Sequence, residues 1–211
     1  MEKDRIKLNL ERIKKEIPSH VRLVAVTKTV SVEEIKILKS LGVNDFGENR
    51  INASEEKIKQ VPADWHMIGH TQSNKAKKAV KLFSVIQSVD SVKIAQAIDK
   101  ECQKQNKRIS ILLQVNIAKE PQKYGFSEEE IESAIEAISH LRNVSLEGFM
   151  MMAPNVEPEK TRCYFKQMKT LFDKYKKQYN LKTLSMGMSN DYKIAIEEGS
   201  NMVRTGTKLF D

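Results

Sequence analysis

The sequence predicts an α/β protein, a single closed (β/α)8 barrel of the TIM type with one extra helix before the first strand. Short apolar segments alternate with amphipathic stretches along the 211 residues, as in repeated strand–helix units. Eight such segments are expected, the number that closes a parallel barrel. Even the first and last are apolar, which favours a closed sheet without edges over an open doubly wound sheet.

The elements follow in chain order. An amphipathic helix is expected over about residues 3–17, with Ile6, Leu10 and Ile13 on one face. Ser31 and Ser127 each precede a glutamate by three residues, which is the capping-box form of a helix start. Strands are expected at 22–27, 43–47, 65–69, 84–89, 109–116, 146–152, 183–188 and 201–205. Intervening helices are expected at about 31–41, 49–60, 74–82, 94–102, 127–141, 157–178 and 191–198.

Composition indicates an ordinary globular protein. The chain is 40% hydrophobic and 30% charged, and we expect one domain over residues 1–211. No apolar run is long enough to span a bilayer, and the first residues lead into a charged stretch, so we expect a cytoplasmic protein. Cys102 and Cys163 lie far apart without a paired motif, which favours two reduced thiols over a disulfide or metal site.

The net charge of +8 raises the question of a polyanionic partner. The lysines are dispersed over the polar positions of several amphipathic helices, as expected for solvated helix faces. A basic nucleic-acid-binding barrel remains the weakest of the alternatives, because basic and aromatic residues do not interleave as in a nucleic-acid-binding surface.

Polar residues gather where the last two expected strands end. In barrel enzymes the functional groups lie at the carboxyl ends of the strands, and phosphate sites commonly use the loops after strands seven and eight. Ser189 and Asn190 follow the seventh strand here, and Arg204–Thr207 closes the eighth. Gly206 would allow close backbone approach. The sequence therefore predicts an anion cradle at this end.

A lysine closes the first expected strand. Val24, Val26 and Lys28 alternate along it and share one face, although a lone lysine in this place is most often a solvent-exposed side chain. A partly desolvated lysine at the barrel mouth would be a usable amine nucleophile, and its attack on an aldehyde gives a Schiff base. A lysine beside a phosphate cradle favours a phosphorylated aldehyde, of which pyridoxal 5'-phosphate (PLP, a form of vitamin B6) is the obvious candidate.

An ordered set of segments from about residue 22 to 210 resembles the pyridoxal phosphate homeostasis protein family. That family is a single-domain relative of the alanine racemase barrel, and the resemblance implies a PLP-binding protein of fold type III. The segments are Ala25–Lys28, Phe46–Asn49, His66–Lys75, Leu113–Asn116, Met151–Pro154, Leu184–Asp191 and Val203–Thr207.

The resemblance also assigns roles. It implies that Lys28 carries the cofactor as a Schiff base, that Arg204 faces the pyridine nitrogen, and that the phosphate is held by Ser189, Gly206 and Thr207. Asn49 would line the cofactor site, and Met188 and Met152 either pack near the ring or belong to the barrel core. His70 is expected to make a structural polar contact rather than line the pocket. Glu48 is expected to anchor its neighbours without a catalytic role.

The expected function is that of a carrier. Arginine can only donate a hydrogen bond to the pyridine nitrogen, which leaves the ring a weak electron sink. A racemase needs a second acid–base group, supplied in the racemases by a tyrosine of another domain that this chain lacks. The resemblance implies a monomeric, non-catalytic protein without catalytic residues that buffers PLP or delivers it to apoenzymes. A PLP-dependent amino-acid racemase-like enzyme is the main alternative.

Overall fold

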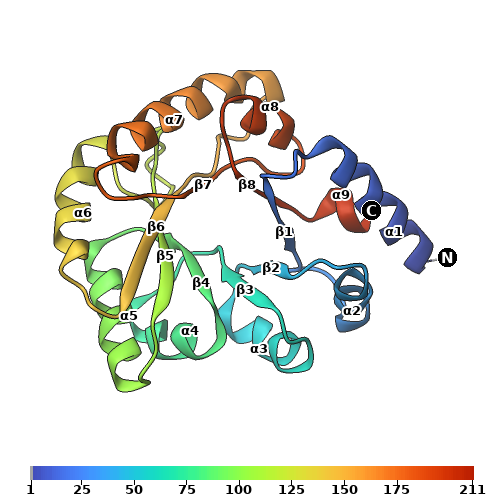
Figure 1. The fold of residues 1–211 in the computed structure, drawn as a ribbon, viewed down its shortest axis with the longest axis horizontal. Coiled ribbons are helices and arrows are strands. Elements are labelled where there is room, and N and C mark those ends of the chain that lie inside the picture. The colour runs from blue at the N-terminus through green and yellow to red at the C-terminus, as the bar shows by residue number, and fades with distance from the viewer. Residues whose placement is uncertain (1) are drawn as a thin grey trace.

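Eight parallel strands form a closed barrel in the computed structural model, which describes residues 2–211 (Figure 1). The sheet closes where the first strand pairs with the last, with Val24 opposite Arg204 and Ala25 opposite Thr205. The predicted fold class is thereby confirmed. The strands are β1 (Arg22–Val26), β2 (Asp45–Glu48), β3 (Asp64–Met67), β4 (Val85–Val89), β5 (Ile109–Gln114), β6 (Val144–Met150), β7 (Thr183–Ser185) and β8 (Met202–Thr205).

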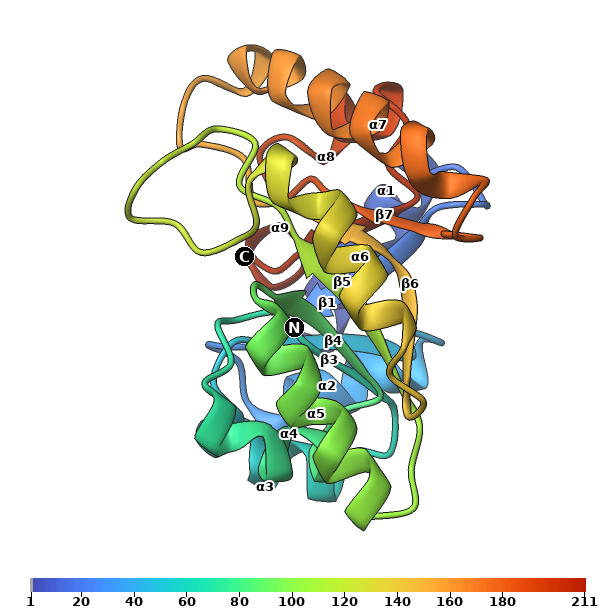
Figure 2. The same cartoon turned by 90° about the vertical axis from the view of Figure 1, so that its left-hand side faces the viewer.

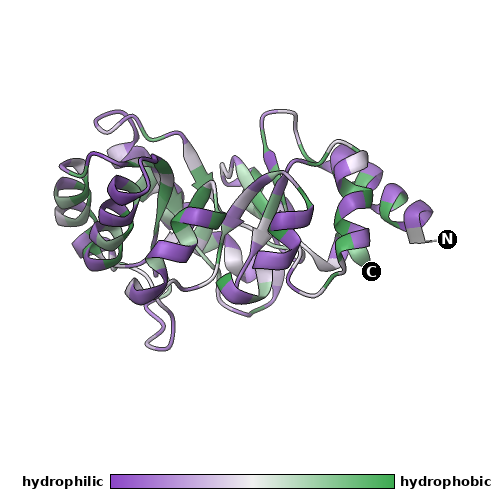
Figure 3. Ribbon diagram, turned by 90° about the horizontal axis from the view of Figure 1, so that it is seen from below, coloured by the Kyte–Doolittle hydropathy of each residue, from purple (hydrophilic) through white to green (hydrophobic). Residues whose placement is uncertain are grey.

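Helices surround the barrel and turn their polar faces outward (Figure 3). Both predicted capping boxes are present, at Ser31 and at Ser127. The α-helices are α1 (Glu2–Glu16), α2 (Val32–Ser40), α3 (Ile51–Gln60), α4 (Ala76–Leu82), α5 (Val92–Lys104), α6 (Ile131–Ser139), α7 (Arg162–Lys176), α8 (Tyr192–Glu197) and α9 (Thr207–Phe210). Short 3-10 turns, η1 (Ser73–Lys75), η2 (Glu128–Glu130) and η3 (Pro158–Thr161), precede α4, α6 and α7.

The extra amino-terminal helix lies beside the carboxyl terminus. Ile6, Leu10 and Ile13 of α1 are buried, as their spacing predicts. Helix α1 packs against α2 and against the short α9 (Figure 1). The helix therefore covers the barrel next to the seam between β1 and β8.

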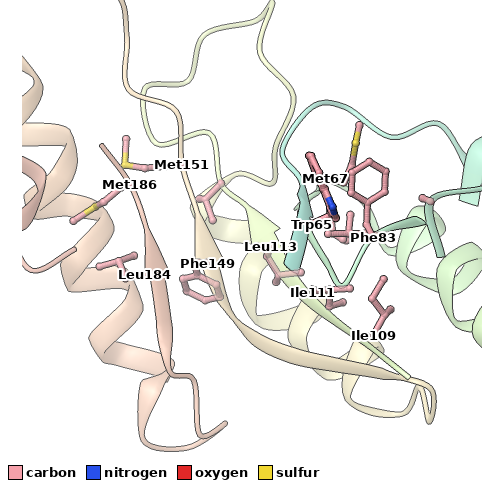
Figure 4. Packing of buried hydrophobic residues seen from close by; sticks show 14 of the residues in the cluster. Trp65, Met67, Phe83, Ile109, Ile111, Leu113, Phe149, Met151, Leu184 and Met186 are labelled. Atoms are coloured by element: carbon pink, nitrogen blue, oxygen red, sulfur yellow. The ribbon is translucent and has the colours of Figure 1, made fainter. Parts of the chain in front are cut away.

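The strands have two different faces. Outward residues such as Trp65, Met67 and Phe149 pack with the helices into one large hydrophobic cluster (Figure 4). The intervening residues point into the barrel, where Gln87 of β4 contacts Ser185 of β7 and Met202 of β8. Since these strands are not neighbours, the contacts cross the interior, which is more polar than the surrounding core.

Several strands end earlier than the sequence predicts. The seventh was expected to reach residue 188, but β7 ends at Ser185 because Gly187 takes a left-handed conformation with φ of +95°. The first ends at Val26, so Lys28 lies in the following turn instead of on the strand face. The polar segment between β5 and α6 reaches out from the barrel (Figure 2).

The two cysteines are free thiols, as expected. Cys102 is buried in α5, where burial raises its pKa to about 11, and Cys163 is exposed. Within residues 2–211 no cluster of histidine, cysteine or carboxylate side chains is arranged to hold a metal ion. No helix in this range has the length and apolar character needed to cross a membrane.

The close contact between β6 and β7 gives a stability prediction. A Cβ at Gly148 would lie 1.8 Å from the Thr183 carbonyl oxygen, so Gly148→Ala must displace backbone. We expect it to lower the free energy of unfolding by about 3 kcal/mol or more, measured by urea denaturation. The control Gly42→Ala has φ of +85° but no atom within 4 Å, and should cost about 1–2 kcal/mol. Equal losses in the two variants would contradict this reading of the β6–β7 contact.

Candidate functional site

A cavity of about 730 Å³ opens at the carboxyl ends of β1, β6, β7 and β8. The loops after these strands supply its walls, as expected for a parallel barrel. The residues that the sequence predicts as a site and that line this cavity are Lys28, Met188, Ser189, Asn190, Arg204, Gly206 and Thr207, and Met152, expected either near the ring or in the core, lines it too. The fold thus brings residues nearly 180 positions apart in the chain to one opening.

Lys28 presents its amine at the cavity. Its side chain is exposed, and within residues 2–211 its Nζ takes part in no hydrogen bond or ion pair. The expected partial desolvation is therefore wrong for this structure, because Lys28 lies in the turn beyond β1 and not inside the barrel mouth. The amine is free to meet a ligand.

The turn that carries Lys28 is held in place by hydrogen bonds to the preceding residue, Thr27. Thr27 is buried and donates its hydroxyl hydrogen bond to Glu48 Oε1 over 2.6 Å. Lys57 Nζ donates both to the Thr27 carbonyl oxygen (2.6 Å) and to Glu48 Oε1 (3.0 Å). Glu48, which is itself buried, therefore anchors the backbone next to Lys28, in agreement with the anchoring role expected for it.

The ends of β7 and β8 meet at the other side of the cavity. The Gly206 amide donates to Ser189 Oγ over 3.4 Å. A Cβ at Gly206 would lie 2.9 Å from the Val26 carbonyl oxygen, so β8 approaches β1 more closely than another residue would allow. Ser189 and Thr207 both reach the cavity, Thr207 with an exposed side chain. These groups form a small cluster of hydroxyl and amide donors.

Arg204 is buried at the floor of the cavity, with 3% of its surface exposed. Its guanidinium donates to Ser185 Oγ (2.5 Å) and to the Met151 carbonyl oxygen (2.7 Å). Burial lowers the pKa of Arg204 to about 10, and the charge of Asp191 opposes that shift. The guanidinium is therefore still cationic at neutral pH.

Asp191, which lines the cavity, and Ser185, which contacts Arg204 from below, are two residues that the sequence analysis did not single out. Asp191 is buried, burial raises its pKa, and its Oδ1 accepts from the Met188 amide over 2.6 Å, which shapes the turn before Ser189. The only signal for Asp191 is its place in the Ser-Asn-Asp helix start. Ser185 lay in the middle of the expected strand and is the last residue of β7, and a single serine there carries no distinctive pattern.

Two other predicted residues lie elsewhere. Asn49 is exposed after β2, with its backbone against Gly69, and it is not among the residues of the described chain that line the cavity. Its place in a cofactor site stays a prediction. His70 hydrogen-bonds Asp90 through Nδ1 (2.6 Å) and stacks on Tyr124 with ring centroids 3.7 Å apart. This is the structural polar contact expected for His70.

Comparison with known proteins places the chain in a family. Residues 1–211 match the family model described as "Alanine racemase, N-terminal domain". A "Pyridoxal phosphate homeostasis protein" from Synechocystis is 37% identical, with 92% of each chain covered. The chain belongs to the pyridoxal phosphate homeostasis protein family. Another member of the family, from Aquifex aeolicus, is 36% identical over 98% of this chain and 96% of its own.

Solved structures extend the comparison. The structure of PipY from Synechococcus elongatus with PLP bound has a TM-score of 0.90 and 32% identity, covering 98% of this chain and all of that one. An alanine racemase of Clostridium difficile has a TM-score of 0.82 with 19% identity, and the match covers 55% of the racemase. The likeness to the racemase shows a shared barrel fold.

The anchor below Lys28 can be tested by stability. Glu48→Ala leaves the Lys57 ammonium, which is largely buried, without its carboxylate, so we expect a loss of about 3 kcal/mol in the free energy of unfolding. Urea denaturation measures this loss. The control Glu56→Ala removes an exposed partner of Lys59 and should cost less than about 1 kcal/mol. A Glu48→Ala protein as stable as the control would refute the anchoring role.

Proposed function

We propose that this protein binds pyridoxal 5'-phosphate in the cavity, holds its aldehyde carbon on Lys28, and buffers the cofactor or delivers it to apoenzymes. One observation carries the proposal. A single cavity combines an amine without a bonding partner in the described chain, a buried guanidinium and a cluster of small donors. The names of the relatives and the PLP-bound PipY structure support the same ligand.

The residues present fit such a ligand. Ser189 Oγ, Thr207 and the Gly206 backbone would hold the phosphate, because hydroxyls and amides without bulky side chains let an anion approach closely. Arg204 would donate to the pyridine nitrogen from the cavity floor. Met188 lines the same wall and would pack near the ring.

PLP, when bound, supplies an aldehyde carbon that an amine attacks with loss of water to form a C=N bond. Lys28 is suited to this task because its Nζ is not held by any partner among the described residues. The exposure of Lys28 also lets water or another amine reach the C=N bond and reverse it. The anchoring of Thr27 by Glu48 and Lys57 fixes the turn, while the lysine side chain beyond it stays exposed.

Arg204 favours a carrier over an enzyme. It stays protonated near neutral pH and has only donors to offer, so the pyridine nitrogen beside it is held unprotonated. The ring then withdraws electrons weakly from a substrate carbanion. We assign no catalytic residue and propose a non-catalytic, cytoplasmic monomer that serves PLP-dependent apoenzymes. Sustained exchange of an amino acid α-proton with solvent, dependent on Lys28, would instead support the racemase-like alternative.

Covalent binding tests the proposal. Wild-type protein mixed with PLP should gain a visible absorption band, and borohydride should fix the cofactor mass on residue 28, located by peptide mass spectrometry. Lys28→Ala and Lys28→Arg should both lose nearly all of the band and of the fixed mass, because neither has a primary amine. The control Lys36→Ala removes an exposed lysine of α2 and should behave as wild type. Equal labelling of another lysine in the Lys28 variants would overturn the site.

A further inference from the structure

A chain of hydrogen bonds crosses the inside of the barrel, from Arg204 on β8 to Asp45 on β2. Arg204 donates to Ser185 Oγ (2.5 Å), which in turn donates to Gln87 Oε1 (2.7 Å). Gln87 Nε2 lies 2.9 Å from His66 Nδ1, and His66 Nε2 lies 2.9 Å from Asp45 Oδ1. The chain joins strands β8, β7, β4, β3 and β2, and its bond between Ser185 and Gln87 crosses the barrel between β7 and β4, which are not neighbours in the sheet.

The partners give the chain one direction. The amide oxygen of Gln87 accepts from Ser185, so the amide nitrogen faces His66 and must donate to its Nδ1. His66 then carries its proton on Nε2 and donates it to Asp45. Burial acts to raise the pKa of Asp45, but the hydrogen bond from His66 and the contact with the Arg22 guanidinium lower it overall. The chain therefore ends on a carboxylate anion.

Every donor in this chain points from the arginine toward the carboxylate. Hydrogen bonds aligned in this way polarise one another, and an anion at the far end favours a cation at the near end. Ser185, Gln87 and His66 have no exposed surface, so an unmade bond in this chain would leave a buried polar group without water. None of the three is among the described residues that line the cavity.

We propose that Ser185, Gln87 and His66 are positioning residues, which hold Arg204 as a charged donor toward the pyridine nitrogen of the bound cofactor. This inference rests on the proposed function. It adds that the state of the ring nitrogen is set from inside the barrel, by residues that never touch the ligand. If these residues only filled space, their substitution would lower the stability of the protein but would not change the state of the pyridine nitrogen of the bound cofactor.

The test measures the protonation and hydrogen bonding of the pyridine nitrogen directly, by NMR. PLP labelled with ¹⁵N in the pyridine ring is bound to each variant, and its ¹⁵N chemical shift is measured at one neutral pH. Ser185→Ala and Gln87→Leu should move the signal toward that of a protonated pyridine, because Arg204 loses its fixed orientation. The dissociation constant for PLP should rise about tenfold, as for the loss of one hydrogen bond to a charged group.

Thr205→Val is the matched control. Thr205 is next to Arg204 on β8 and fully buried, but its hydroxyl has no hydrogen-bond partner within the described residues. The variant should therefore leave the ¹⁵N signal and the affinity for PLP as in the wild type. Gln87→Glu keeps an acceptor for Ser185 Oγ, so Ser185 can keep its orientation toward Arg204, and the signal of this variant should lie close to that of the wild type.

The outcomes separate the two proposals. A wild-type protein without cofactor fixed on Lys28 refutes the proposed function itself. If the wild type is labelled on Lys28 and Gln87→Leu binds PLP with an unchanged ¹⁵N signal, the positioning role is refuted while the proposed function stands. Circular dichroism checks folding, and if Gln87→Leu fails to fold, the smaller change Ser185→Ala decides in the same way.

Discussion

The burial of the Arg204 guanidinium determines which polar side chains the inside of the barrel must contain. Arg204 is charged at neutral pH and has almost no contact with solvent. A buried charge without partners is too costly to keep, so its donors must meet oxygens of the protein. Strand β7 supplies Ser185, and the backbone after β6 supplies the Met151 carbonyl. The polar interior of this barrel is the consequence, since each partner buried with Arg204 needs a partner of its own.

Closure of the barrel determines which residues lie together around the cavity above Arg204. Parallel pairing of β1 with β8 places Lys28 and Gly206 at the same rim, although one is near each end of the chain. The contact of Gly206 with the Val26 backbone draws the two strand ends together. The site is therefore a product of the seam. A change that opened β1 from β8 would separate the Lys28 amine from the hydroxyl and amide donors of Ser189 and Gly206 while leaving each segment locally intact.

The sequence predicts which residues lie at the seam, because polar residues at the ends of strands are a local pattern. Lys28, Ser189 and Thr207 line the cavity as this pattern indicates, although Lys28 lies in the turn after β1 and does not continue the alternation of the strand. The interior chain does not follow from such patterns, since His66 and Gln87 are single polar residues within apolar strands. The bond that carries the chain across the barrel joins Gln87 to Ser185, 98 positions further along the sequence. The end of β7 was also missed, because the left-handed turn at Gly187 depends on how α8 packs against it.

The two ends of the proposed site differ in a way that suits a carrier. At the Lys28 end the amine is exposed and unheld, whereas at the Arg204 end the donor is buried and fixed by a chain across the barrel. Covalent capture at such an exposed lysine is reversible by water and amines. The rigid end keeps its orientation whether or not that bond exists, because its partners belong to the protein interior. If Lys28 holds the cofactor as proposed, release would be governed by exchange at this one exposed nitrogen, with no need to unfold or rebuild the pocket.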